Sequence, residues 1–507
     1  MASLFRPPGL AAAGRVDPRD ADAAFNAGID ALSHGGEAAA LRLVAKAVQH
    51  HPRDPRLWQV IGLIHRALED LEPAVAALRK AAALAPHDAR IAHALARARL
   101  EAGLPATEAF LAAHRLAPLD GGILLGLAAA QAAEGHAAAA MRGIDGQLQA
   151  NPGWLAGHAL LAGLRWMHDD RAGFTASYEQ ALARAPRDIA LWRELIVTLM
   201  HADLYGEALA AIARGRAAAG PHVMFDANEA ICVAEMGETE RADRLFAALP
   251  PTGDATVLVR RIRHLLRSGR PAEAAALAEP LLGGGEAYLL WPYVATAWRL
   301  LGDARWHWLE GQPGLVGVYD LADRIPSLDA LARRLRALHV APGQPLEQSV
   351  RGGTQTDGPL FARIEPEIRA LRKAVVAAVE QHVAGLPPPD PKHPTLRARH
   401  GPIRFSGSWS VRLLAAGHHA NHIHPMGWFS SALYVALPMQ EESGPPPAGW
   451  LTLGQPQAEL GVPLDPFRLI EPKPGRLVLF PSTMWHGTMP IVGGERMTVA
   501  FDVAPPR

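Results

Sequence analysis

The first part of the chain repeats apolar residues with the period of amphipathic helices, and prolines interrupt this pattern at a nearly fixed interval. The interval is 32 to 34 residues, and several prolines share a setting such as HPRD, APHD or APRD. The prolines are Pro52, Pro86, Pro118, Pro152 and Pro186. A fixed period of this length predicts stacked units of two helices each, because one such unit cannot bury its apolar face alone.

The unit that precedes Pro86 shows the pattern most clearly. Trp58 and Gly62 mark its first helix, and Ala74 and Leu78 mark its second. Small residues let two helices approach, and large ones fill the groove that remains. The pattern resembles the tetratricopeptide repeat, which implies an α-solenoid that binds a protein or peptide partner.

These patterns predict a domain organisation for the N-terminal part of the chain. We expect a flexible tail over residues 1–20 and about six tetratricopeptide repeats over 21–220. Beyond Pro221 the repeat phase fades while the helical periodicity continues, so residues 221–310 are expected to be degenerate helical repeats.

Near residue 311 the alanine-rich helical pattern ends, and residues 311–507 are expected to form a second kind of domain. An amphipathic helix is predicted over IEPEIRALRKAVVAAVEQHVAGL. Strand-like alternation then dominates residues 400–507, the expected barrel core, in SWSVRLL, FSSALYVALP, WLTLG, GRLVLFP and RMTVAFDV. Short strands of this kind predict a double-sheet jelly roll with flanking helices, and hence a multidomain α + β protein.

Composition narrows the function classes. Lys and Arg number 50, as do Asp and Glu, so the zero formal charge argues against a nucleic-acid partner or an anionic membrane surface. No uncharged apolar run reaches about 18 residues, so we expect no membrane span. Cys232 is the only cysteine, which excludes an intrachain disulfide and favours the cytoplasm.

The candidate chemistry lies in the predicted barrel. Histidines gather in the segment GHHANHIH, as His418, His419, His422 and His424. His422 and His424 are two residues apart, so on an extended strand both side chains project to the same face. His486 follows the later strand LVLFP. Two near imidazoles and a remote one that converge inside a barrel suit a divalent transition metal.

At these residues the chain resembles the iron(II)- and 2-oxoglutarate-dependent dioxygenases. Their double-stranded β-helix carries an H-x-D/E pair on one strand and a second histidine on a later strand. An arginine beyond that histidine binds the far carboxylate of 2-oxoglutarate, and Arg496 follows His486 by ten residues. Thr498 completes the R-x-S/T pair of many members. A planar guanidinium makes two hydrogen bonds to a carboxylate, and the hydroxyl adds one.

The resemblance is more specific to a bacterial branch of 2-oxoglutarate/iron oxygenases with an H-x-H-P motif and a serine-rich, tyrosine-containing strand. NHIHP followed by Ser430, Ser431 and Tyr434 fits this pattern, as does LFPSTMWHGTMP. The resemblance covers residues 345–507. It implies iron(II), 2-oxoglutarate and O₂ as cofactors, and Tyr434 as a further contact of 2-oxoglutarate.

One position departs from the superfamily, because His424 stands where the acidic metal ligand is usual. Three outcomes are open: a three-histidine site, a two-histidine site of His422 and His486, or loss of the iron. We expect His422 and His486 to be ligands and His424 to be the third. His418 and His419 are weaker candidates.

Two classes of function follow. The first is a dioxygenase, by default a hydroxylase, whose solenoid recruits a protein or peptide substrate. The second is a non-catalytic tetratricopeptide scaffold with a degenerate oxygenase-like module, which the missing acidic ligand favours. A small-molecule hydroxylase is a further alternative. Arg496 and Thr498 favour an enzyme, since an inactive site has little need of residues that bind the carboxylate of 2-oxoglutarate.

Overall fold

The computed structural model describes residues 16–346, 348–397 and 401–506. Residues 1–15, which belong to the expected N-terminal tail, lie outside the described residues. Two compact units are present. One contains the residues up to Ile144 together with Asp357–Arg369, and the other contains Asp145–Thr356 and Ala370–Arg507.

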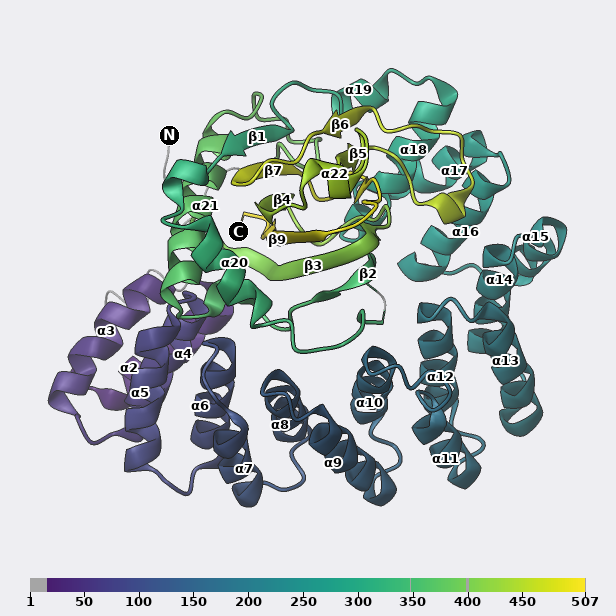
Figure 1. Ribbon diagram of the computed structural model, residues 1–507. Helices are drawn as coiled ribbons and strands as arrows, with labels where there is room; N and C mark the ends of the chain where they lie inside the picture. Colours follow the sequence, from purple (N-terminus) through teal and green to yellow (C-terminus); the bar gives the residue numbers. More distant parts are fainter. Residues whose placement is uncertain (1–15, 347, 398–400, 507) are drawn as a thin grey trace. The chain divides into compact units, whose positions relative to one another are not determined.

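The first unit is an array of helices in which each packs against the next along the chain (Figure 1). The helices are α2 (Ala21–His34), α3 (Glu37–His50), α4 (Pro55–Ala67), α5 (Leu71–Leu84), α6 (Ala89–Glu101), α7 (Thr107–Leu116) and α8 (Gly121–Ala133). Helix α9 (Ala137–Ala150) crosses the boundary between the two units. This succession of short helix pairs confirms the predicted solenoid of repeats.

An aspartate caps the first helix of most repeats. The carboxylate of Asp54 accepts a hydrogen bond of 2.9 Å from the backbone N–H of Arg56 at the start of α4. Equivalent caps are Asp20, Asp88, Asp120 and Asp188. A capping carboxylate satisfies backbone N–H groups that have no partner inside the helix. The recurring P-x-D tripeptide therefore has a local structural cause.

Close packing explains the small residues of the repeat. A Cβ atom at Gly62 would lie 2.5 Å from Cγ of Leu78, which is closer than non-bonded carbon atoms approach. Helices α4 and α5 therefore meet at a distance that only glycine allows at this position, as the repeat pattern predicts.

The segment Asp357–Arg369 packs onto the repeats of the first unit. The backbone N–H of Ile364 donates to the carbonyl of Ala102 at 3.2 Å. The guanidinium of Arg369 lies 2.7 Å from the carboxylate of Glu72. Part of the repeat surface in this unit is therefore covered by the chain itself.

Helical hairpins continue through the first half of the second unit, up to Leu309. They are α10 (Leu155–Met167), α11 (Ala176–Arg184), α12 (Ile189–His201), α13 (Tyr205–Ala219), α14 (Val223–Glu235), α15 (Thr239–Ala248), α16 (Ala255–Arg267), α17 (Pro271–Ala278), α18 (Trp291–Leu301) and α19 (Arg305–Leu309). Buried apolar side chains form one cluster over α11–α15 and another over α16–α18.

Two antiparallel sheets follow these helices in the second unit (Figure 1). The six-stranded sheet has the order β1-β7-β4-β9-β3-β2, and the three-stranded sheet has the order β6-β5-β8. The strands are β1 (Gly317–Asp320), β2 (Val350–Gln355), β3 (Phe405–His419), β4 (Phe429–Ala436), β5 (Leu451–Leu453), β6 (Arg468–Ile470), β7 (Arg476–Pro481), β8 (His486–Thr488) and β9 (Glu495–Val503). Leu453 and Phe480 belong to one buried cluster shared by the two sheets.

Helices α20 (Leu328–Arg336) and α21 (Pro366–Ala384) flank this double sheet. His382 of α21 packs edge-on against Phe429 of β4, with 4.8 Å between the ring centroids. The antiparallel double sheet with flanking helices confirms the predicted jelly roll, and the chain is a multidomain α + β protein.

The small sheet is anchored on the helices of its own unit. The indole N–H of Trp485 lies 3.0 Å from the hydroxyl of Thr296 and 3.2 Å from the carbonyl of Pro292, both on α18. Trp485 is buried in the cluster formed by α16–α18. This contact fixes the residue that directly precedes His486.

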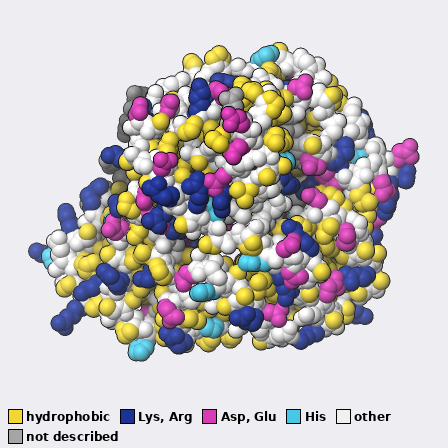
Figure 2. All heavy atoms as spheres, in the orientation of Figure 1, with side chains coloured by type: hydrophobic (Ala, Val, Ile, Leu, Met, Phe, Trp, Pro, Cys, Tyr) yellow, Lys and Arg dark blue, Asp and Glu magenta, His cyan; other side chains and the backbone are white. Residues whose placement is uncertain are grey.

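Basic and acidic side chains are both spread over the face of the molecule that Figure 2 shows. Within the part of the chain that the structure describes, no helix has both the length and the apolar character that crossing a membrane requires.

Candidate metal centre

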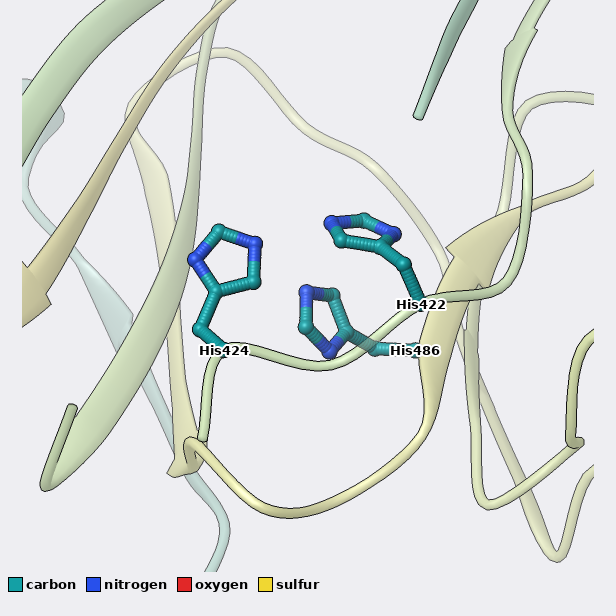
Figure 3. A group of neighbouring side chains, drawn as sticks. All are labelled: His422, His424 and His486. Atoms are coloured by element: carbon teal, nitrogen blue, oxygen red, sulfur yellow. The ribbon is translucent and has the colours of Figure 1, made fainter. Parts of the chain in front are cut away.

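Three histidines from two distant segments converge in the barrel (Figure 3). One ring nitrogen from each of His422, His424 and His486 lies within 4.8 Å of those of the other two. The ring centroid of His422 is 4.2 Å from that of His486 and 4.9 Å from that of His424. The structure therefore brings together the three residues that the sequence proposes as ligands.

The backbone that carries these histidines is not the extended strand that the sequence predicts. Strand β3 ends at His419, and the chain continues as a loop. His422 forms an isolated antiparallel bridge with His486, and the backbone N–H of His424 donates to the carbonyl of Ser482 at 2.9 Å. The prediction of an extended strand was wrong because β3 ends at His419, and the residues after it hydrogen-bond to His486 and Ser482 instead of continuing the pairing of β3 with β2 and β9. The rings converge through tertiary hydrogen bonds.

Each of the three imidazoles donates a hydrogen bond through Nδ1. The Nδ1 atom of His422 lies 2.8 Å from the carbonyl of Ala420, and that of His486 lies 2.9 Å from the carbonyl of Met484. A carbonyl only accepts, so both Nδ1 atoms carry the proton and both Nε2 atoms carry a lone pair. Such anchoring fixes the tautomer that metal-binding histidines need.

Burial keeps two of these rings neutral. Burial lowers the pKa of His422 well below its ordinary value, and the neighbouring histidines lower it further. Burial also lowers the pKa of His486 well below its ordinary value, with a further contribution from His424. Neutral imidazole is the form that binds a metal ion, so these two side chains are ready to bind without first losing a proton.

The third imidazole has a different partner. The Nδ1 atom of His424 lies 2.6 Å from Oδ2 of Asp502. The other carboxylate oxygen of Asp502 accepts a hydrogen bond of 2.6 Å from the hydroxyl of Ser430. The site therefore contains a carboxylate. Asp502 hydrogen-bonds to His424 and does not reach the space between the three rings.

Sequence reasoning missed Asp502, and a simple signal would have found it. Arg496, Thr498, Ala500 and Asp502 all line the same pocket. They alternate along β9, because every second residue of a strand faces the same side. Extending the R-x-T pattern by two further steps therefore leads to Asp502.

The expected clamp for 2-oxoglutarate combines a buried cation with an unpaired hydroxyl. Arg496 is 1% exposed, and its Nη1 donates to the carbonyl of Gly449 at 2.9 Å. Among the described residues, no carboxylate pairs with this guanidinium, and its Nε has no hydrogen-bond partner. Its central carbon lies 5.0 Å from the ring centroid of Tyr434, whose buried hydroxyl also has no partner.

Burial changes the pKa of both groups of this clamp. Burial lowers the pKa of Arg496 and raises that of Tyr434, and each group opposes the shift of the other. A buried cation without a counter-ion is costly, and so is a buried hydroxyl without a partner. The pair is therefore suited to an anion with hydrogen-bond acceptors.

One pocket joins the three histidines to Arg496, and Tyr434 lies beside Arg496 but is not among the residues that line this pocket. The pocket encloses about 550 Å³ of empty space, open solvent at its mouth included. Thr498 lines it, as do Gln348 and Ser349 from the approach to β2. Trp409 lines it too and stacks on His424, with 5.4 Å between the ring centroids and 16° between the ring planes.

The two weaker histidine candidates lie differently. His419 lines the pocket, and burial lowers its pKa to about 3. The hydroxyl of Ser349 lies 3.2 Å from Nδ1 of His419 and 3.2 Å from Nε2 of His422. His418 is not among the residues that line the pocket. His419 is thus a neighbour of the three histidines and a polar wall of the pocket.

Residues 407–502 match the family described as "Putative 2OG-Fe(II) oxygenase". The matched range runs from β3 to Asp502 on β9 and includes all three histidines and Arg496. No curated protein matches the chain.

Solved structures match part of the chain at low similarity. MamA from Desulfovibrio magneticus RS-1 is 19% identical, with 33% of this chain and 95% of that chain covered and a TM-score of 0.30. YrrB, described as a TPR protein with an unusual peptide-binding site, is 17% identical, with 34% and 91% covered and a TM-score of 0.29. A tetratricopeptide repeat protein from Parabacteroides merdae is 17% identical, with 46% and 95% covered and a TM-score of 0.30.

The repeat is evident in the chain itself, from its proline period, its capped helix pairs and the close contact at Gly62. The chain therefore combines an N-terminal array of tetratricopeptide-like repeats with a C-terminal domain that matches the model of the "Putative 2OG-Fe(II) oxygenase" family over residues 407–502.

Proposed function

We propose that the C-terminal domain is an iron(II)- and 2-oxoglutarate-dependent dioxygenase that hydroxylates a protein or peptide recruited by the repeats. The single observation that carries this proposal is the pocket that joins three anchored imidazoles to a buried guanidinium, which has no carboxylate partner among the described residues. Such a pocket offers one group of donors for a metal ion and another for a dicarboxylate.

The residues present fit iron(II). Imidazole nitrogen is a good ligand for this ion, and the three rings reach the pocket from separately anchored backbone positions. We propose His422, His424 and His486 as the ligands. When bound together, iron(II) and 2-oxoglutarate supply the oxidising chemistry, in which O₂ is consumed, CO₂ and succinate are released and the substrate gains a hydroxyl group.

The residues of the clamp fit the far carboxylate of 2-oxoglutarate. Arg496 would bind it through two parallel hydrogen bonds, and the hydroxyls of Tyr434 and Thr498 would donate to it. The carboxylate would give the guanidinium its missing counter-ion and Tyr434 its missing partner. These residues would thereby orient the keto acid.

A non-catalytic scaffold explains the pocket less well. A buried charge without a partner costs several kcal/mol, and a binding module without a cosubstrate gains nothing in return. The repeats would serve the enzyme by presenting a polypeptide, which is the usual role of such arrays.

Two steps of one experiment test the proposal. The full-length protein is titrated anaerobically with iron(II) and then with 2-oxoglutarate, and the weak visible charge-transfer band is recorded. Oxygen is then admitted and succinate is measured. We expect the band and oxygen-dependent succinate in the wild type. His486→Ala should lose both, while Glu495→Gln, on the same strand as the clamp but outside the pocket, should keep both. A wild type that binds no metal would refute the proposal.

A further inference from the structure

We propose that Asp502 is a positioning residue that makes His424 the third metal ligand. The carboxylate would then act on the metal through the imidazole of His424 instead of binding the metal directly. This inference rests on the proposed function, because it concerns how the same three histidines hold the metal. It gives a role to Asp502, the carboxylate among the described residues that line the pocket.

Two contacts hold the ring of His424, and a third holds its backbone. Its Nδ1 atom lies 2.6 Å from Oδ2 of Asp502, and its face stacks on Trp409. Its own backbone N–H donates to Ser482 at 2.9 Å. The hydrogen bond at Nδ1 leaves Nε2 as the nitrogen available to a metal. The ring is therefore fixed in both tautomer and orientation before any metal arrives.

Asp502 is itself held in place. Its side chain is 13% exposed, and its second oxygen accepts from Ser430 at 2.6 Å. Ser430 and Asp502 are directly opposite each other in the pairing of β4 with β9. The contact with His424 is thus a fixed internal hydrogen bond, unlike a surface ion pair that forms and breaks in water.

The charge of the partner sets His424 apart. His422 and His486 donate to neutral carbonyls, whereas His424 donates to a carboxylate. A carboxylate partner raises the basicity of the imidazole and strengthens its bond to a metal. Three neutral imidazoles with one ionised carboxylate also carry the same formal charge as the usual pair of histidines with one carboxylate. With a neutral His424 in place of the usual carboxylate, the metal site would carry one more positive charge. The carboxylate of Asp502 would offset that charge.

The test measures cobalt(II) binding to the full-length protein without oxygen, by the visible absorption of the bound ion. Asp502→Asn removes the charge and keeps the shape, and Asp502→Ala removes the acceptor. We expect affinity to fall about 10-fold in the first variant and about 100-fold in the second, and the absorption band to shift in both. Glu495→Gln is the matched control, because Glu495 lies on the same strand and pairs with Arg336 and Arg412 outside the pocket.

A double-variant cycle shows whether Asp502 acts through His424. His424→Ala should lower the affinity by itself, and adding Asp502→Asn to it should cause no further loss. Thermal unfolding of each variant without metal verifies that it is folded, and Asp502→Asn carries the test if Asp502→Ala is not.

The outcomes separate this inference from the proposed function. No cobalt binding by the wild type would refute the proposed function. Binding that is lost in His422→Ala and His486→Ala but unchanged in both Asp502 variants would overturn the role of Asp502 and leave the proposed function standing. Unchanged binding in His424→Ala, or equal losses from Asp502→Asn with and without His424, would overturn it as well.

Discussion

His422 and His486 exchange both backbone hydrogen bonds across an antiparallel bridge. The N–H of His422 donates to His486 at 2.8 Å, and the N–H of His486 donates back at 3.0 Å. The bridge ties the loop after β3 to the start of β8, and the peptide groups alone make it. The positions of the two rings are therefore set by the backbone, independently of a metal.

His422→Ala should abolish metal binding without unfolding the protein. The backbone bridge survives the substitution, so we expect the thermal midpoint without metal to change by no more than about 4 °C. Metal raises the midpoint of the wild type because it binds only the folded state, and we expect this rise to disappear in the variant. Thermal unfolding with and without cobalt(II) checks both. A metal-dependent rise that persists would contradict the role of His422.

Arg496→Met should have opposite effects on stability and on cosubstrate binding. It removes a buried charge that has no carboxylate partner among the described residues, so we expect the protein without 2-oxoglutarate to be as stable as the wild type or more stable. Binding of 2-oxoglutarate should fall at least about 100-fold, since a charge-assisted pair is lost. Calorimetric titration and chemical unfolding measure the two effects. Arg496→Lys, which keeps the charge but loses the planar fork, should give an intermediate affinity.

Tyr434→Phe should weaken 2-oxoglutarate binding at no cost to the fold. The hydroxyl has no hydrogen-bond partner in the structure, so its removal leaves no donor or acceptor unsatisfied. We expect an unchanged or higher free energy of unfolding and a KM for 2-oxoglutarate raised about 10-fold, the value of one hydrogen bond to a charged group. Succinate release at varied 2-oxoglutarate gives the KM. An unchanged KM would show that Tyr434 does not contact the cosubstrate.

The helical part of the second unit should lose stability in acid through Glu235. Burial by itself raises the pKa of Glu235, but Arg263, Arg260 and Arg267 outweigh it, and the pKa falls from 4.5 to about 2. The folded pKa lies below the unfolded one, so the stabilisation is complete above about pH 4.5 and is lost as the pH falls toward 2.

Glu235→Gln should therefore lower the free energy of unfolding by about 3 kcal/mol at pH 7 and by progressively less below pH 4.5. Urea unfolding followed by tryptophan fluorescence at pH 7 and pH 3 measures the difference. The matched control is Glu273→Gln, which breaks a surface ion pair with Arg270 and should cost little at either pH. A loss for Glu235→Gln that is equal at both pH values would contradict the low pKa.

Much of the candidate site is visible in the sequence because its parts follow local rules. The spacing of Arg496 and Thr498 is the two-residue period of a strand, and the cluster that contains His422 and His424 lies within a few residues. Asp502 follows the same period and was overlooked because the motif of the resembled family ends at Thr498. The contact between Asp502 and His424 has no such local signature, since it depends on how β9 passes the loop after β3.

The sequence by itself determined the repeats and the strands of the barrel. Each helix pair packs mainly on its neighbours in the chain, so the repeat leaves a period in the sequence. Tertiary structure alone decided which strands pair, that the backbones of His422 and His486 form a bridge, and that the buried guanidinium of Arg496 has no carboxylate partner in the described part of the chain. Sheet pairing and burial join residues that are distant along the chain, and no local pattern of apolar and polar positions records which distant partner a residue will meet.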